Sequence, residues 1–161
     1  MDITFDKQAS ALKGFFEALQ TLYDVNILTN KKDFTGQLGE WFVATIYNGK
    51  RAVSGINKGW DVVVSGKYIQ VKTHSKAKTN SATFSAISKN PKGAIDELVI
   101  IDFSATYKIN AFYQVPWEIA VGFITTRGKL QPRDELKWSS IQSYKVDLNK
   151  LPRQEVISLF I

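Results

Sequence analysis

The chain has 161 residues, of which 44% are hydrophobic and 12% aromatic, enough to bury one core, so we expect a single domain over residues 1–161. It has no cysteine and one histidine, which excludes disulfides, thiolate nucleophiles and metal sites built from cysteines or several histidines. It has no apolar run of about 18 residues and no visible signal peptide, so we expect a cytoplasmic protein without a membrane span.

The net charge of +6 is unevenly distributed along the chain. Residues 50–92 hold nine lysines and arginines but a single acid, Asp61, which gives this stretch a net charge of +8 and leaves −2 for the rest. Such a basic segment favours a polyanionic partner, although a solvated basic surface loop has the same composition. The side chains that we predict to contact nucleic acid are Lys58, His74, Lys76, Lys78 and Lys89.

Two helices are predicted in the first third of the chain. Residues 7–23 carry apolar side chains at i, i+3, i+4 and i+7, a pattern that predicts an amphipathic helix packed into the core. Residues 34–47 predict a second helix, which Asp33 or Thr35 can cap and Asn48-Gly49 can end.

The second helix contains one residue that does not suit its surroundings. Residues 38–47 are apolar nearly all round, and Glu40 is the only charge among them. Burying an unpaired carboxylate costs several kcal/mol or drives it to take up a proton. We therefore expect Glu40 to face Lys72, a metal ion or the solvent of a cleft; the alternative is an exposed glutamate on an incompletely buried helix.

A β-hairpin is predicted for residues 59–72. Strict alternation in its second arm puts Gln70 and Lys72 on one face. A two-residue turn at Ser65-Gly66 would place Asp61 opposite Gln70, and a turn one residue later would place it opposite Lys72; both bring the three polar groups to one face. Polar side chains in such apolar arms are costly to bury alone, and a metal ion or a phosphate would supply their partners.

The rest of the chain mixes strand, turn and helix signals. We predict, in order, loop or partial helix at 73–93, a buried central strand at 97–104, its hairpin partner at 108–115, a short helix at 117–121, a basic loop at 125–133 and an unassigned tail at 136–161. Together these elements predict an α/β (α+β) fold, with a mixed β-sheet flanked by helices.

Two carboxylates, a third oxygen ligand and a lysine can hydrolyse phosphodiesters with the help of Mg²⁺ or Mn²⁺. The order of these residues resembles the PD-(D/E)XK nuclease superfamily, the restriction-endonuclease-like fold, in its Gln-x-Lys form. The matching motifs are Gly36-Gln-Leu-Gly39-Glu40, Gly59-Trp60-Asp61 and Gln70-Val71-Lys72. The chain is also similar to small uncharacterised bacterial members of the superfamily. The resemblance covers a core at 33–120, between an N-terminal helical extension at 1–32 and a C-terminal elaboration at 121–161.

The resemblance implies a metal-dependent DNA endonuclease that leaves 5′-phosphates and acts in restriction, phage defence, mobile elements or repair. It implies that Glu40, Asp61, Gln70 and the Val71 backbone carbonyl hold Mg²⁺ or Mn²⁺, while Lys72 orients the attacking water. A homodimer or larger homo-oligomer would then supply two sites for two strands. Gln70 stands where the superfamily commonly has an acid, so metal affinity should be weaker. Two alternatives are a non-catalytic nucleic-acid-binding or protein-interaction module and an RNA-directed nuclease toxin.

Overall fold

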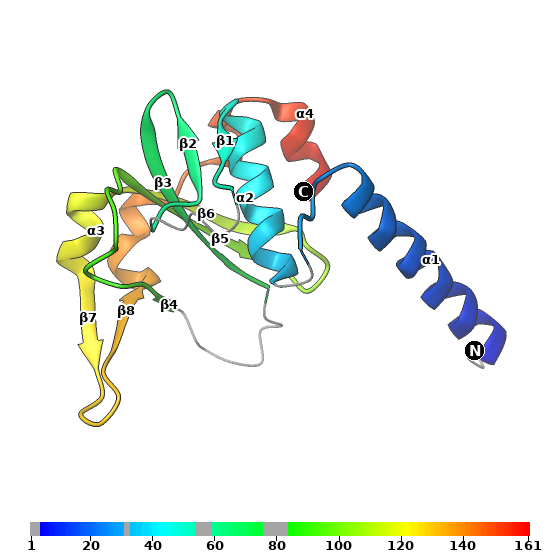
Figure 1. The fold of residues 1–161 in the computed structure, drawn as a ribbon, viewed down its shortest axis with the longest axis horizontal. Coiled ribbons are helices and arrows are strands. Elements are labelled where there is room, and N and C mark those ends of the chain that lie inside the picture. Colours follow the sequence, from blue (N-terminus) through cyan, green and yellow to red (C-terminus); the bar gives the residue numbers. More distant parts are fainter. Residues whose placement is uncertain (1–3, 31–32, 54–58, 76–83) are drawn as a thin grey trace.

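The computed structural model describes residues 4–30, 33–53, 59–75 and 84–161. Its centre is a mixed five-stranded sheet with the strand order β1-β2-β3-β5-β6, in which β3 and β5 are parallel and the other neighbours antiparallel (Figure 1). These strands are β1 (Lys50–Arg51), β2 (Val62–Val64), β3 (Lys67–His74), β5 (Glu97–Phe103) and β6 (Ile109–Pro116). The predicted α/β class, with a mixed sheet flanked by helices, is confirmed.

The hairpin β2–β3 closes on a two-residue turn at Ser65-Gly66. Val64 pairs with Lys67 across it, and both turn residues have positive φ angles, 48° and 84°. Positive φ at both central positions matches the right-handed twist of the flanking strands. The earlier of the two predicted turn positions is therefore the observed one.

Strand β5 is a buried interior strand, between β3 and β6, as its apolar sequence predicts. Val99 and Ile101 belong to the core cluster on one face of the sheet, under helix α2 (Phe34–Ile46). Leu98 and Ile100 belong to the cluster on the other face. The strand thus divides the molecule into two apolar layers. Strand β6 likewise has one face in each cluster, whereas the core residues of β3 all belong to the cluster under α2.

Helix α2 lies unusually close to β3. A Cβ atom added at Gly39 would collide with Cγ2 of Thr73, so only glycine permits this approach. The helix begins at Asp33, whose carboxylate accepts a hydrogen bond from the Gly36 N–H at 2.9 Å. Its outer side is covered by α4 (Gln154–Ile157) and η3 (Ser158–Phe160), where the Phe160 ring packs edge-on against Phe42 at 5.1 Å.

A small second sheet covers the opposite face. It has the order β4-β8-β7 and is joined there by α3 and η1 (Figure 1). The basic segment 125–133, predicted as a loop, instead supplies most of one strand and the start of another, because Ile124 and Leu136 anchor a hairpin in the core. The bounds are β4 (Phe84–Ala86), α3 (Trp117–Phe123), β7 (Ile124–Arg127), β8 (Arg133–Lys137), η1 (Trp138–Tyr144) and η2 (Leu148–Lys150).

Helix α1 (Phe5–Asp24) extends away from the rest of the molecule (Figure 1). None of its residues is buried, so the prediction that this helix packs into the core is wrong. Both faces of the central sheet are already covered by α2 and by the second sheet, so the apolar stripe of α1 has no place there among the described residues. No helix among the described residues has the length and apolar character needed to cross a membrane.

Candidate active site at the edge of strand β3

Strand β3 is longer than its neighbour β2, and the difference exposes an edge. The ladder between the two strands ends where Val62 pairs with Ile69, so in the described chain β3 has no strand on that side from Gln70 onward. The N–H of Asp61 also bonds to the Ile69 carbonyl, at 2.9 Å. Asp61 therefore lies just beyond the end of the ladder, with its N–H still bonded to β3.

Asp61 does not lie where the turn position predicts. A continued ladder would place Asp61 opposite Gln70, on the same face, but the N–H of Asp61 bonds to the Ile69 carbonyl and the two residues do not pair. Its Oδ2 instead accepts a hydrogen bond from the Val71 N–H at 2.7 Å, so the carboxylate occupies the exposed edge of β3. The N–H and C=O of one strand residue point to the same side, and the Val71 carbonyl is thus directed to this edge too.

Glu40 approaches the same edge from helix α2. It follows Gly39, the residue that allows α2 to lie directly on β3. Burial raises the pKa of Glu40 from 4.5 to about 7, and the negative charge of Asp61 adds to this rise, while the charges of Arg51 and Lys72 oppose it. Two carboxylates from distant parts of the chain are therefore close enough to repel each other.

The charge state of Asp61 is under the same influences. Burial raises the pKa of Asp61 above its ordinary 3.8, against the Val71 hydrogen bond and the charge of Lys72, which both lower it. Neither Asp61 nor Glu40 forms a direct ion pair with a basic side chain among the described residues. The edge thus holds excess negative charge that a cation would neutralise.

Lys72 reaches this pair of acids from the other face of the sheet. It pairs with Ile100, which packs in the cluster opposite α2, and Gln70 shares that face through its pairing with Leu98. The ammonium charge nevertheless lowers the pKa of both Glu40 and Asp61, so it acts on them across the exposed edge. The two acids and the lysine thus influence one another electrostatically, while the side chains of Lys72 and Gln70 lie on the face of the sheet opposite α2 and Glu40.

Gln70 presents a buried acceptor with no partner. Its Oε1 receives no hydrogen bond from any described residue. Leaving a buried acceptor unsatisfied costs about 1–3 kcal/mol, so a ligand that bonds to this oxygen would recover that energy. The side chain lines a hollow of about 380 Å³, together with Gly59 and the loop residues Ser88, Asn90, Pro91 and Lys92.

Two charged residues join the site that the sequence patterns do not assign to it. Asp33 was predicted only as a helix cap, yet its charge also raises the pKa of Glu40 and Asp61. Arg51 was counted only within the basic segment; its guanidinium is held by the carbonyls of Asn26 and Ile27 and lowers the pKa of Glu40. Neither has a motif: Asp33 acts from the start of α2, and Arg51 acts from β1, which lies against α2.

The available donors fit a hard divalent cation. At the edge they are the two carboxylates and the Val71 carbonyl, all of them oxygen ligands of the kind that Mg²⁺ and Mn²⁺ prefer. The orphaned amide oxygen of Gln70 is a donor of the same kind, on a side chain that lies on the face of the sheet opposite α2. No cluster of three His, Cys, Asp or Glu side chains with metal-binding geometry occurs in the described residues.

The residues predicted to contact nucleic acid have different positions. Lys58, Lys76 and Lys78 lie outside the described residues. Lys89 is exposed on the loop after β4, where its N–H bonds to Asp134 at 2.8 Å. His74 takes part in packing between the two sheets: its Nε2 lies 2.8 Å from the Ser85 hydroxyl, and its ring meets that of Trp138 edge-on at 5.0 Å.

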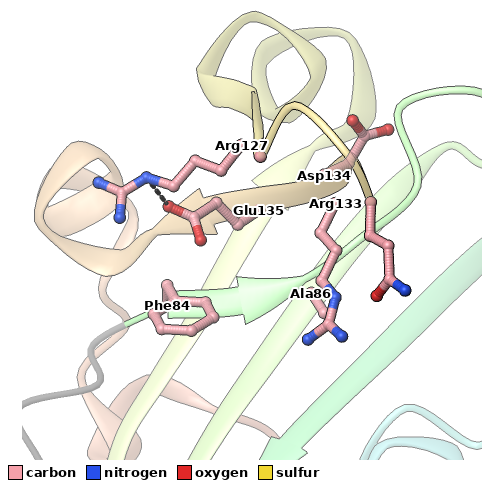
Figure 2. A pocket seen from close by; sticks show the side chains of 8 residues that line it. Phe84, Ala86, Arg127, Arg133, Asp134 and Glu135 are labelled. Atoms are coloured by element: carbon pink, nitrogen blue, oxygen red, sulfur yellow. Dashed lines mark ion pairs between the residues drawn. The ribbon is translucent and has the colours of Figure 1, made fainter.

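A second hollow, of about 330 Å³, lies on the small sheet (Figure 2). Its acids already have partners: Glu135 pairs with Arg127 at 2.7 Å, and Asp134 accepts hydrogen bonds from Thr126 and Lys89. Figure 2 shows Arg127 and Glu135 directed toward each other, with Phe84 on the neighbouring strand. Because its charges are compensated internally, this hollow is the weaker candidate for a catalytic centre.

Neither a scan against models of known protein families nor a comparison with curated protein sequences finds a match to this chain. The functional assignment therefore depends on the geometry and electrostatics of the β3 edge.

Proposed function

We propose that the protein is a metal-dependent endonuclease that hydrolyses DNA phosphodiester bonds at the edge of β3. The observation that carries the proposal is the pair of carboxylates, Glu40 and Asp61, which repel each other, are influenced by the charge of Lys72 and form no direct ion pair among the described residues. Concentrating two partly buried acids is unfavourable for folding, and it is an arrangement typical of functional sites.

Each residue has a role that its position supports. Glu40, Asp61, Gln70 and the Val71 carbonyl would hold Mg²⁺ or Mn²⁺, which when bound lowers the pKa of water and neutralises charge on the phosphate. The Val71 N–H fixes the orientation of the Asp61 carboxylate through its 2.7 Å hydrogen bond. Lys72 would orient the attacking water and stabilise negative charge that develops on the phosphate oxygens.

The charge distribution supports nucleic acid as the substrate. Asp61, Gln70 and Lys72 all lie within residues 50–92, which carry a net charge of +8. A positive surround attracts the phosphate backbone and offsets the repulsion between it and the two carboxylates. We propose DNA as the substrate. Comparing the cleavage rates of DNA and RNA would show whether RNA is preferred instead.

A second candidate function is nucleic-acid binding without cleavage. Gln70 favours it, because an amide brings no negative charge and leaves the site one carboxylate short of three. This candidate predicts salt-sensitive DNA binding that needs no divalent cation and survives replacement of Lys72.

The test is cleavage of supercoiled plasmid with Mg²⁺ or Mn²⁺, comparing wild type with Lys72→Ala. We expect a loss of at least about 100-fold in rate, the scale seen when one group that stabilises the transition state is removed. The matched control is Lys67→Ala, on the same strand but exposed at the turn, which should cleave like the wild type.

The outcomes separate the two candidates. Cleavage that needs metal and Lys72 but not Lys67 supports the endonuclease. Two results contradict the endonuclease: DNA binding without cleavage in the presence of either Mg²⁺ or Mn²⁺, or equal cleavage by wild type and Lys72→Ala.

A further inference from the structure

Helix α1 presents the largest exposed apolar surface among the described elements. Its rings Phe5, Phe15 and Phe16 are 79%, 58% and 59% exposed, and Leu12 is 55% exposed. A helix that is apolar along one side normally buries that side against another element. Here no residue of the helix is buried, so no described part of the chain covers this side.

The helix does not have the composition to stand alone in water. Most of the stability of a protein helix comes from packing of its apolar face rather than from intrinsic propensity. Gly14 lies in the middle of α1, with nothing within 4 Å of the position of a Cβ atom, and an exposed glycine there costs about 1 kcal/mol relative to alanine. Neither the glycine nor the exposed rings suit a solvated helix, and a covering partner would account for the rings.

The apolar positions follow a heptad that is complementary to itself. With Phe5, Leu12 and Leu19 at the a positions, Phe15 and Leu22 fall at d. The g positions are Ala11 and Ala18, small residues that permit close approach. The charged residues all fall at the outward b, c and f positions, so two copies bring no like charges together: Asp6, Lys7, Lys13, Glu17 and Asp24.

The exposed area is sufficient for a pairing of two copies. A buried aromatic side chain covers about 150–250 Å². The three rings therefore leave roughly 400 Å² uncovered on each copy, and the leucines bring the total for two copies to roughly 1,000 Å², the lower limit of specific interfaces.

The position of the rest of the chain sets the direction of the pairing. The bulk of the molecule lies at the C-terminal end of α1, and the N-terminal end is free of it (Figure 1). Parallel helices would bring two such bodies to the same end, where they would compete for space. Antiparallel helices place them at opposite ends, and the a and d layers then match Leu12 of one copy with Phe15 of the other.

We propose that α1 is a dimerisation helix, which pairs antiparallel with α1 of a second copy of this chain through its Phe5–Leu22 stripe. The inference does not depend on nuclease activity. In a nuclease, the pair would bring two β3-edge sites together in one assembly.

The first test is sedimentation velocity of the full chain over a micromolar concentration series. We expect a species of twice the monomer mass. The double variant Leu12→Glu/Phe15→Glu should weaken dimerisation by at least about 30-fold, as expected for removal of a central anchor. The matched control, Ser10→Glu/Gly14→Glu, adds the same charge to the outward face and should leave the dimer intact.

Three results would overturn the proposal: a wild-type monomer throughout the series, a dimer that Leu12→Glu/Phe15→Glu leaves unchanged, or a control variant that weakens dimerisation equally. Circular dichroism checks that both variants keep the folded body, which does not use α1 in its core.

Direction is tested separately by disulfide crosslinking, because the chain has no cysteine of its own. In the antiparallel register, a mixture of Leu12→Cys and Phe15→Cys chains should form the crosslinked mixed dimer in preference to either homodimer. Preferential crosslinking of each variant with itself would indicate parallel helices and contradict the proposed arrangement.

Discussion

Replacing Glu40 by glutamine should stabilise the protein and at the same time remove its function. The pKa of Glu40 in the folded protein is about 7, compared with an ordinary 4.5, so the folded state holds this proton more tightly than the unfolded state does. The contribution of the Glu40 proton to the free energy of unfolding is therefore fully present below pH 4.5 and is lost as the pH rises through about 7. Glutamine mimics the protonated side chain and avoids that loss.

The size of the effect follows from the two values. Each pKa unit corresponds to about 1.36 kcal/mol, so the full difference would be about 3.4 kcal/mol. Glu40 is only partly buried, and solvent screening reduces this to about 2 kcal/mol. We expect Glu40→Gln to be about 2 kcal/mol more stable than wild type at pH 8 and equally stable at pH 4.5.

The assay is urea unfolding followed by circular dichroism at both pH values. The control is Glu118→Gln, an exposed position on α3, which should show no such pH-dependent difference. Equal stability of wild type and Glu40→Gln at pH 8, or the same difference at both pH values, would refute the reasoning. A parallel set with Mn²⁺ at pH 8 should stabilise the wild type more than the variant, because the cation removes the repulsion only where the charge is present.

Three further substitutions test the geometry around the site. Asp61→Asn should lower the pKa of Glu40, because the charge of Asp61 contributes to the rise of that pKa. NMR titration of the Glu40 carboxyl carbon measures the pKa, and an unchanged value would show that the two groups are apart. Gly39→Ala should cost about 1–3 kcal/mol through collision with Thr73, and adding Thr73→Ser should recover much of the loss because it removes the colliding methyl group; a thermal melt without that recovery would contradict the packing. Ser85→Ala should cost about 1–3 kcal/mol, because the buried hydroxyl accepts the Trp138 indole N–H at 3.0 Å, and unchanged stability in urea would show that this bond contributes nothing.

The strongest sequence signals predicted local structure correctly because they arise from local physics. The Ser65-Gly66 turn follows from the need for positive φ, and the buried β5 follows from an unbroken apolar run. Helix α2 follows from its apolar sequence and the Asp33 cap. Each of these depends on residues close together in the chain.

The errors have a shared physical cause, since they depend on contacts that a local pattern does not encode. The stripe on α1 predicts burial but does not specify what covers it. The strands of segment 125–133 form because Ile124 and Leu136 meet a core built by distant residues. The ladder between β2 and β3 ends at Val62, so Asp61 does not pair with Gln70, and parity arguments from the turn cannot detect where a ladder ends.

The candidate site was predictable in its members and less so in its arrangement. Glu40 was conspicuous as one charge on an apolar helix, and its raised pKa is consistent with that reasoning. The effects of Asp33 and Arg51 on the pKa of Glu40 depend on the packing of β1 against α2, which no sequence motif predicts.

The central claim is that the edge of β3 captures a divalent cation. Crystals soaked in Mn²⁺ and measured near the manganese absorption edge would locate the ion by its anomalous signal. We predict one strong peak within bonding distance of Glu40, Asp61 and the Val71 carbonyl, with Gln70 as a further ligand. A fully soaked crystal without a peak there, or with manganese bound only elsewhere, would contradict the account.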